Sequence, residues 1–487
     1  MSGTTGDTAG DDVFDDIFRV NTLNDSTLLR VNSLGGDDVI DVAAAAAGDV
    51  EIDGGLGNDG FIVELGGAVD RLVTVDDSGV NEGVDRLDVF FSDDAQTINV
   101  FDTIARIQHS VASSTVDFDP TFEVLALHGL GGDDRFVVTG TTTDELILAG
   151  GAGDDTYDIA DVFGDTSVSI LDSVNAENDR LTVNGTSGDD TFIINENSFL
   201  INGNAFIIDD AINSNIVGIE SLEVNALDGD DTFIVNSATR GFDLLGGDGD
   251  DHFMIHDTAA DAGANALVID GGTGANTMEI QRISGLPPFV VIEDDSIRNV
   301  ANSTIQFSAT GGSFTGGNGG IRINGLDDVN DSFLVFGVLA ENSIQLHGFG
   351  GNDFHRVADT VAGDVWLDGG VGRDRYVFFL DENRSRNLRV SDSGTSDEVD
   401  RINAFLTQNS DNIVLDGPEI AVVNDRLTFV PTIETFEILA GDGDDQIEVR
   451  QFDGVRFLSI RGDVGNDTFV SNSTGGCLLY TSPSPRD

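Results

Sequence analysis

The chain has 487 residues, of which 88 are acidic and 23 basic, so its formal net charge is −65 at pH 7. It contains no lysine, and because such a surface repels nucleic acid and anionic lipid, we expect neither as a partner and expect cations instead. Hydrophobic residues make up 39% of the chain, too many for a plain disordered acidic polymer, and no apolar run reaches the length of a membrane span.

Residues 1–283 repeat a unit in which glycine, aspartate and an apolar residue alternate. Residues 54–62 read GGLGNDGFI, residues 150–158 read GGAGDDTYD, and residues 246–254 read GGDGDDHFM. Apolar residues alternate with others on both sides of each turn, which is typical of half-buried strands, and glycine supplies the positive φ angle that a sharp turn needs. In this segment the turn aspartates are Asp38, Asp59, Asp134, Asp155, Asp190, Asp231 and Asp251.

Two periods govern the repeat. Neighbouring turn aspartates lie about 20 residues apart in several places, which suits one solenoid coil of two short strands and two turns. Larger blocks recur at roughly 100 residues. The sequence therefore predicts an all-β fold, a parallel β-solenoid of the β-roll or β-helix kind, in which each coil buries the apolar face of its neighbour.

The rest of the chain divides into three parts. Residues 284–320 contain two adjacent prolines and a glycine-rich stretch, and we expect an irregular insertion or joint there. Residues 321–476 resume the array, with GGVGRDRYV at 369–377 and turn aspartates Asp374, Asp445 and Asp467. Residues 477–487 read CLLYTSPSPRD, which is similar to a translated sequencing adapter, so we expect this tail to be non-native and the native ends to lie elsewhere.

Stacked coils bring turn aspartates close together, because neighbouring strands lie only about 4.8 Å apart. Two carboxylates about 5 Å apart repel by about 3 kcal/mol at an effective dielectric near 20. A cation between the coils removes this cost, and a site made only of carboxylate and carbonyl oxygens suits Ca²⁺ better than Mg²⁺. Two alternatives remain open: glycine and aspartate that simply favour turns, and a generally acidic, salt-adapted surface.

These nonapeptides resemble the GGxGxDxUx repeat of hemolysin-type (RTX) calcium-binding proteins. In that family a parallel β-roll holds calcium through the sixth-position aspartate and carbonyls of the glycine-rich loops. The resemblance implies calcium ligands at Gly57, Asp59, Gly153, Asp155, Gly249, Asp251, Gly372 and Asp374, and also at Asp38, Asp134, Asp190, Asp231, Asp445 and Asp467. This chain offers one nonapeptide per coil, whereas the family runs them back to back, so we expect calcium along one edge only. Asn276 replaces one acidic ligand.

The functional expectation is a calcium-binding structural or adhesive region of a large secreted or cell-surface bacterial protein, whose folding is coupled to Ca²⁺. No export signal is visible, and no carboxylate pair is singled out for catalysis, so we expect no enzymatic activity in this segment. The expected partners are calcium ions and a cell-surface or matrix polysaccharide or protein. The alternatives are an accessory array of a polysaccharide-acting extracellular enzyme, and a solenoid scaffold that needs no calcium.

Overall fold

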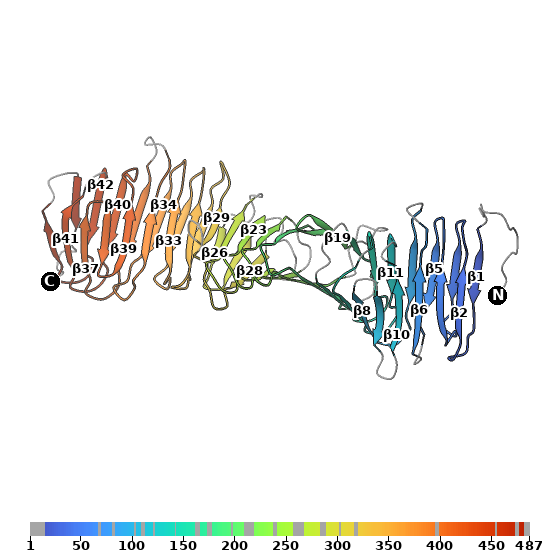
Figure 1. Cartoon of the computed structure of the whole chain (residues 1–487). Coiled ribbons are helices and arrows are strands. Elements are labelled where there is room, and N and C mark those ends of the chain that lie inside the picture. Colours follow the sequence, from blue (N-terminus) through green and yellow to red (C-terminus); the bar gives the residue numbers. More distant parts are fainter. Residues whose placement is uncertain are drawn as a thin grey trace. The chain divides into compact units, whose positions relative to one another are not determined.

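The computed structural model shows two long parallel β-sheets joined by short turns (Figure 1). It describes residues 15–66, 70–79, 83–101, 104–108, 113–119, 122–141, 143–160, 166–172, 178–195, 198–208, 219–236, 241–256, 267–282, 289–300, 303–315, 320–394, 399–452, 455–472 and 477–481. Contacts divide the chain into two compact units, Met1–Leu227 with Arg240–Phe242 and Asp228–Thr239 with Asp243–Asp487. The expected β-solenoid is confirmed.

In the first unit, strands alternate between the two sheets along the chain. The first sheet contains β1 (Ile17–Val20), β3 (Val39–Val42), β5 (Gly60–Glu64), β7 (Arg86–Phe90), β11 (Val124–His128), β13 (Glu145–Ala149), β15 (Ser167–Ile170), β17 (Thr191–Ile194), β18 (Ser198–Ile201) and β19 (Asn204–Ile208). The second contains β2 (Leu28–Asn32), β4 (Asp49–Asp53), β6 (Arg71–Asp76), β8 (Thr97–Phe101), β9 (Ile104–Gln108), β10 (Ser113–Phe118), β12 (Arg135–Val138), β14 (Thr156–Ala160), β16 (Arg180–Asn184) and β20 (Ser221–Asn225).

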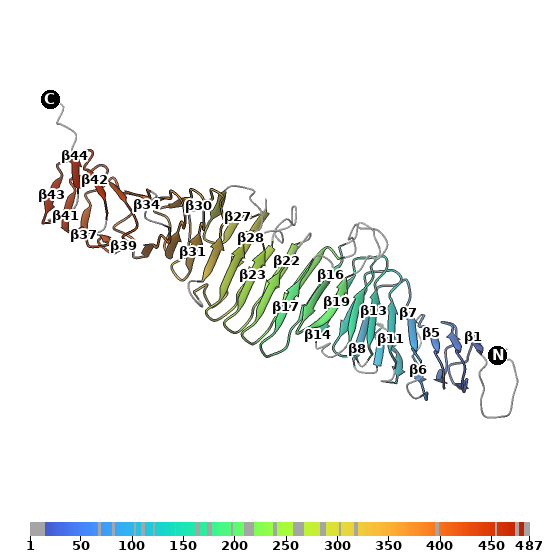
Figure 2. The same cartoon turned by 90° about the horizontal axis from the view of Figure 1, so that it is seen from above.

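The second unit has the same design, as the view in Figure 2 also shows. Its first-sheet strands are β21 (Thr232–Val235), β23 (His252–His256), β25 (Thr277–Gln281), β29 (Ile321–Asn324), β31 (Ser343–His347), β33 (Asp364–Asp368), β35 (Asn387–Val390), β37 (Asn412–Asp416), β38 (Glu419–Val422), β39 (Asp425–Phe429), β41 (Gln446–Gln451) and β43 (Thr468–Ser471). Its second-sheet strands are β24 (Leu267–Asp270), β26 (Phe289–Ile292), β27 (Ser296–Val300), β28 (Ser303–Ser308), β30 (Ser332–Val335), β32 (Phe354–Val357), β34 (Arg375–Phe379), β36 (Arg401–Phe405), β40 (Thr435–Leu439), β42 (Phe457–Arg461) and β44 (Cys477–Thr481). β22 (Gly241–Leu245) belongs in part to each unit.

Four antiparallel meanders interrupt the parallel stacking. They are β8–β9–β10, β17–β18–β19, β26–β27–β28 and β37–β38–β39, and their outer strands pair in parallel with the regular coils. The third meander lies inside residues 284–320, where the sequence indicated an irregular insertion. The described parts of that stretch therefore form ordered strands of the second sheet. In the expected non-native tail, Cys477–Thr481 extends the second sheet as β44 beside β42, and residues 482–487 lie outside the described residues.

The interior of each unit is a row of stacked side chains from successive coils. In β5, Phe61 and Val63 point inward and are fully buried, as the alternating pattern predicts. Rings two residues after a turn aspartate stack on one another: Phe136 on Tyr157 at 5.2 Å between ring centroids, and Phe233 on Phe253 at 4.8 Å. These spacings match the strand separation, so aromatic rings of neighbouring coils stack directly on one another in the core.

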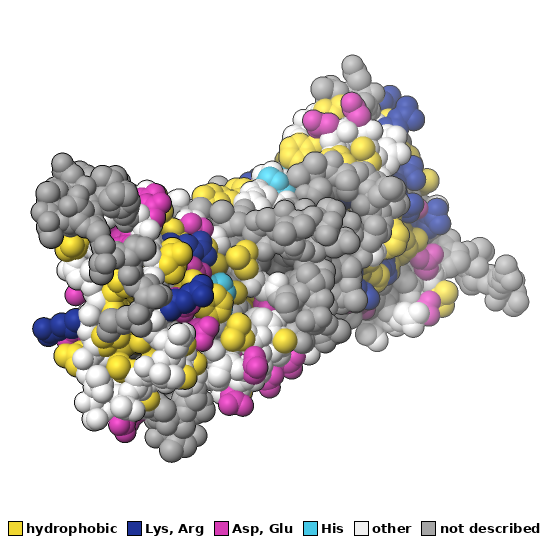
Figure 3. Space-filling model, turned by 90° about the vertical axis from the view of Figure 1, so that its right-hand side faces the viewer, with side chains coloured by type: hydrophobic (Ala, Val, Ile, Leu, Met, Phe, Trp, Pro, Cys, Tyr) yellow, Lys and Arg dark blue, Asp and Glu magenta, His cyan; other side chains and the backbone are white. Residues whose placement is uncertain are grey.

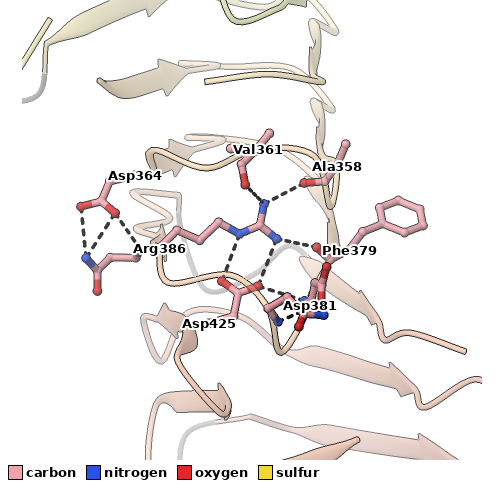
Figure 4. A network of polar contacts seen from close by, with 9 residues as sticks. Ala358, Val361, Asp364, Phe379, Asp381, Arg386 and Asp425 are labelled. Atoms are coloured by element: carbon pink, nitrogen blue, oxygen red, sulfur yellow. Dashed lines mark hydrogen bonds and ion pairs between the residues drawn. The ribbon is translucent and has the colours of Figure 1, made fainter. Parts of the chain in front are cut away.

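A buried arginine joins neighbouring coils of the second unit. It lies on the edge opposite the aspartate turns of the same coils. Arg386 is fully buried and donates to the carbonyl oxygens of Ala358, Val361 and Phe379, which belong to two neighbouring coils (Figure 4). It also forms a two-pronged ion pair with buried Asp425, at 3.0 and 3.1 Å. The guanidinium thus satisfies backbone oxygens that would otherwise be buried without a donor.

Among the described residues no helix is long and apolar enough to cross a membrane.

Candidate metal centre

The turn aspartates are buried and lie immediately before a strand. Asp38, Asp59, Asp134, Asp155, Asp190, Asp231, Asp251, Asp374 and Asp445 are each at most 2% exposed, and Asp467 is half-buried. Burial of so many acids in one kind of turn excludes a merely salt-adapted surface as their explanation. The acids that do reach solvent lie scattered among apolar and polar side chains on the face seen in Figure 3.

Successive aspartates are joined by hydrogen bonds that run along the stack. The backbone N–H of Asp38 donates to Oδ1 of Asp59 at 2.8 Å, and the N–H of Asp59 donates to Oδ1 of Asp85 at 2.7 Å. We call such a series an aspartate column. The same bond joins Asp134 to Asp155, Asp231 to Asp251, and Asp445 to Asp467. Charge-assisted bonds of this kind hold neighbouring turns together without any metal.

Five such columns are formed by the described residues. They comprise Asp16, Asp38, Asp59, Asp85 and Glu123; Gln96, Asp134, Asp155, Asp179 and Glu220; Asp231, Asp251 and Asn276; Asp331, Asp353, Asp374, Asp400 and Glu434; and Asp411, Asp445 and Asp467. Asp190 precedes β17, and its carboxylate accepts from the Thr186 N–H and the Asn202 side chain, both at 2.6 Å.

The expectation of a single acidic edge is wrong. In the first unit, the turns of the first column lead into the first sheet, whereas those of the second column lead into the second sheet. The second unit alternates in the same way through its three columns. The reason is an odd count of strands per block: Asp38 precedes β3 and Asp134 precedes β12, and likewise Asp231 precedes β21 and Asp331 precedes β30. An odd count moves the next column to the opposite edge.

The four expected glycine ligands have a strong structural reason to be glycine. Gly57, Gly153, Gly249 and Gly372 have φ between 140° and 150°. A Cβ on Gly57 would lie 2.0 Å from the carbonyl oxygen of Gly36 in the preceding coil, and the other three are equally close to such an oxygen. The carbonyl of Gly57 in turn faces Gly83 of the next coil. These turns are therefore stacked in direct backbone contact.

One oxygen of many column carboxylates has no hydrogen-bond partner among the described residues. This holds for buried Oδ2 of Asp38, Asp59, Asp134, Asp251, Asp353 and Asp445. Burial raises the pKa of Asp59, Asp251 and Asp445 to about 6, of Asp353 to about 7 and of Asp134 to about 8, with neighbouring carboxylates adding to the effect. Each such oxygen needs a proton or a cation near it.

Three carboxylates converge at two points, and we call these groups the carboxylate triads. In the first, oxygens of Asp59, Asp77 and Asp85 lie within 4.8 Å of one another, and all three residues are buried. In the second, the same is true of the oxygens of Asp155, Asp172 and Asp179. Two ligands of one Ca²⁺ are separated by at most about twice the 2.3–2.6 Å ligand distance, so the triads have the dimensions of a calcium site.

Burial, the hydrogen bond to Asp85 and the charge of Asp85, in that order, raise the pKa of Asp77 to about 7. In the second triad, the Tyr157 hydroxyl donates to Oδ2 of Asp172 at 2.6 Å and accepts from the Gly150 N–H at 2.7 Å. This tyrosine fixes the orientation of one carboxylate of the triad. The oxygen-only donor set, and the unpartnered Oδ2 of Asp59, fit a hard divalent cation.

A third group shares this design. Asp374 donates its N–H to Oδ1 of Asp400 at 2.8 Å, and Asp392 is hydrogen-bonded to Asp400. Burial, followed by the charge of Asp400, raises the pKa of Asp392 to about 8. Tyr376 holds the place of Tyr157, because its hydroxyl accepts from the Gly369 N–H. The spacing from first to last aspartate is 26 and 24 residues in the two triads and 26 residues in this third group.

Sequence reasoning missed the second and third member of both triads and of the third group. They are Asp77 and Asp85, Asp172 and Asp179, and Asp392 and Asp400. A signal exists, because each pair begins with Asp-Ser and ends with Asp-Arg followed by leucine or isoleucine, after a GGxGxD turn. The contacts among these aspartates could not be predicted from the sequence without knowing which coils are neighbours.

The fold and the triads define a parallel β-solenoid whose turns carry buried carboxylate groups suited to divalent cations. No known family matches the chain, and no curated protein is similar to it.

Proposed function

We propose that this chain is a calcium-binding structural region of a large secreted or cell-surface bacterial protein, and that its folding is coupled to Ca²⁺. The observation that carries the proposal is the convergence of three buried carboxylates within 4.8 Å at Asp59, Asp77 and Asp85, repeated at Asp155, Asp172 and Asp179. The resemblance of the nonapeptides to RTX repeats and the acidic composition support the same function.

The ions belong at the triads rather than between all column aspartates. Along a column, Oδ1 of each aspartate already accepts a backbone N–H, and the glycines stack in direct contact. At the first triad the third carboxylate, that of Asp77, adds a negative charge, and no arginine among the described residues forms an ion pair with this group. Bound Ca²⁺ would neutralise this charge and tie the loop that carries Asp77 to the two coils before and after it. Adhesion by the assembled solenoid is the corresponding biological role.

The test is calorimetric titration of the chelator-stripped chain with CaCl₂. We expect saturable binding at the triads, release of protons because Asp77 and Asp392 have raised pKa values, and more β-structure by circular dichroism. Asp77→Asn, Asp172→Asn and Asp392→Asn should each remove one site. Asp359→Asn, an exposed acid outside the triads, should leave the stoichiometry unchanged.

If all three variants bind as many ions as the unaltered chain, the triads are not the sites. Identical spectra and melting curves in calcium and in EGTA would instead favour the second candidate, a solenoid scaffold that needs no calcium. The observation in favour of that candidate is the column itself, whose N–H to carboxylate bonds already join the coils.

A further inference from the structure

The chain's only tryptophan lies on the outer face of the first sheet in the second unit. Trp366 is in β33 and is 36% exposed, whereas large side chains of the solenoid are otherwise directed mainly into the core. In register with it lie Gln345 on β31 and Arg389 on β35, one strand away on either side. An exposed indole on a flat parallel sheet offers an apolar platform with polar groups at both edges.

A hollow of about 190 Å³ surrounds this platform. Two rows of side chains that cross β31, β33 and β35 line the hollow. The first row is Gln345, Trp366 and Arg389, and the second is His347, Asp368 and Ser391. Gln345 is 6% exposed, and its Oε1 accepts from Nη2 of Arg322 at 3.3 Å. The hollow thus combines one aromatic face with amide, hydroxyl, carboxylate and guanidinium groups.

The hollow contains an arginine without an ion-pair partner. In a chain with 88 acidic and 23 basic residues, Arg389 forms no ion pair with any described residue. Arg322, two strands from Trp366 in the same row, donates to the Gln345 side chain. Arg389, which lines the hollow beside the exposed indole, is therefore available to an external ligand.

We propose that the hollow at Trp366 binds a pyranose unit of a polysaccharide, preferably a uronate. The apolar C–H face of the sugar ring stacks on the indole. Asp368 and the amide of Gln345 are placed to bond its hydroxyls, and Arg389 to bond its carboxylate in the two-pronged manner that guanidinium groups favour. The site needs no metal, so it stands independently of the triads and gives the solenoid a ligand of its own.

Because Trp366 is the only tryptophan, its fluorescence reports on this site alone. Folded chain in calcium buffer is titrated with a galacturonate trisaccharide and with a glucose trisaccharide. We expect a saturable shift of the emission with both sugars, at least tenfold tighter for the uronate. Arg389→Ala should remove that preference, and Trp366→Ala, followed by calorimetry, should weaken both sugars at least tenfold.

The matched control is Arg298→Ala, which removes a half-exposed arginine from the second sheet and should change neither titration. Circular dichroism must show that each variant is folded like the parent. The proposal is overturned if neither sugar shifts the emission at millimolar concentration, or if Trp366→Ala binds both as tightly as the parent. Equal affinity of the parent for both sugars would refute the role of Arg389.

Discussion

At the scale of single residues, the core contains a polar ring, that of His355, in a row of aromatic side chains. His355 occupies the position of an aromatic ring, between Phe333 at 5.2 Å and Tyr376 at 5.1 Å, and is fully buried. Neither ring nitrogen has a hydrogen-bond partner among the described residues. Burial lowers the pKa of His355 to about 3, so the ring is neutral in the folded chain.

Replacing His355 by phenylalanine should therefore stabilise the fold. The change removes an unsatisfied buried polar group, which typically costs about 1–3 kcal/mol, and keeps the ring stack. It should also remove an acid sensitivity, because the unfolded histidine takes up a proton below about pH 6.5 whereas the folded one resists until about pH 3. Urea denaturation at pH 7 and pH 5 measures both effects; a variant less stable than the parent at either pH would contradict the argument.

At the scale of elements, the nonapeptide turn was predictable and its partners were not. The spacing of glycine, aspartate and apolar residues predicted the strands and the aspartate turns before them correctly, because these are local properties of one coil, whereas the burial of the aspartates was not predicted. The meanders, the alternation of columns between edges, the Arg386–Asp425 pair and the triads join residues from different coils. Asp59 and Asp85 are 26 residues apart, and only the stacking order makes them neighbours.

The turn geometry can be tested with two glycines three residues apart. Gly57→Ala should destabilise strongly, by more than about 2 kcal/mol, because it forces a side chain to φ 140° and brings Cβ to 2.0 Å from the Gly36 oxygen. Gly60→Ala should be tolerated, since the nearest atom to its Cβ is 3.9 Å away. The melting temperatures of both variants test this prediction. Equal losses of stability in the two variants would show that backbone stacking does not fix the turn.

At the scale of the whole molecule, buried acids make stability depend on pH in an unusual direction. The pKa of Asp353 is raised to about 7 and that of Asp134 to about 8, both above the usual 3.8, so folding favours their protonated forms. Their stabilising contribution is complete below about pH 4 and is lost as pH rises through 7 and 8. The net charge of −65 works in the same direction, because self-repulsion grows as the acids ionise.

We therefore expect the chelator-treated chain to be more stable at pH 5 than at pH 8.5 in urea denaturation. Asp134→Asn should reduce this difference and stabilise the chain at pH 8.5 by about 1–3 kcal/mol, because a neutral amide needs no proton there. Asn276 already fills a column position, where its Oδ1 accepts the Asp251 N–H at 2.8 Å. A stability that rises steadily from pH 5 to pH 8.5 would count against this account of the columns.

Because each block has an odd number of strands, the orientation of a block depends on whether an even or an odd number of blocks precedes it. Loss of a single block would turn every later block half a revolution about the long direction of its unit, so that groups displayed on one side would reappear on the other. Loss or gain of two blocks would restore their orientation. Recombination between blocks is thus expected to conserve display of a surface feature such as Trp366 only when it moves blocks in pairs.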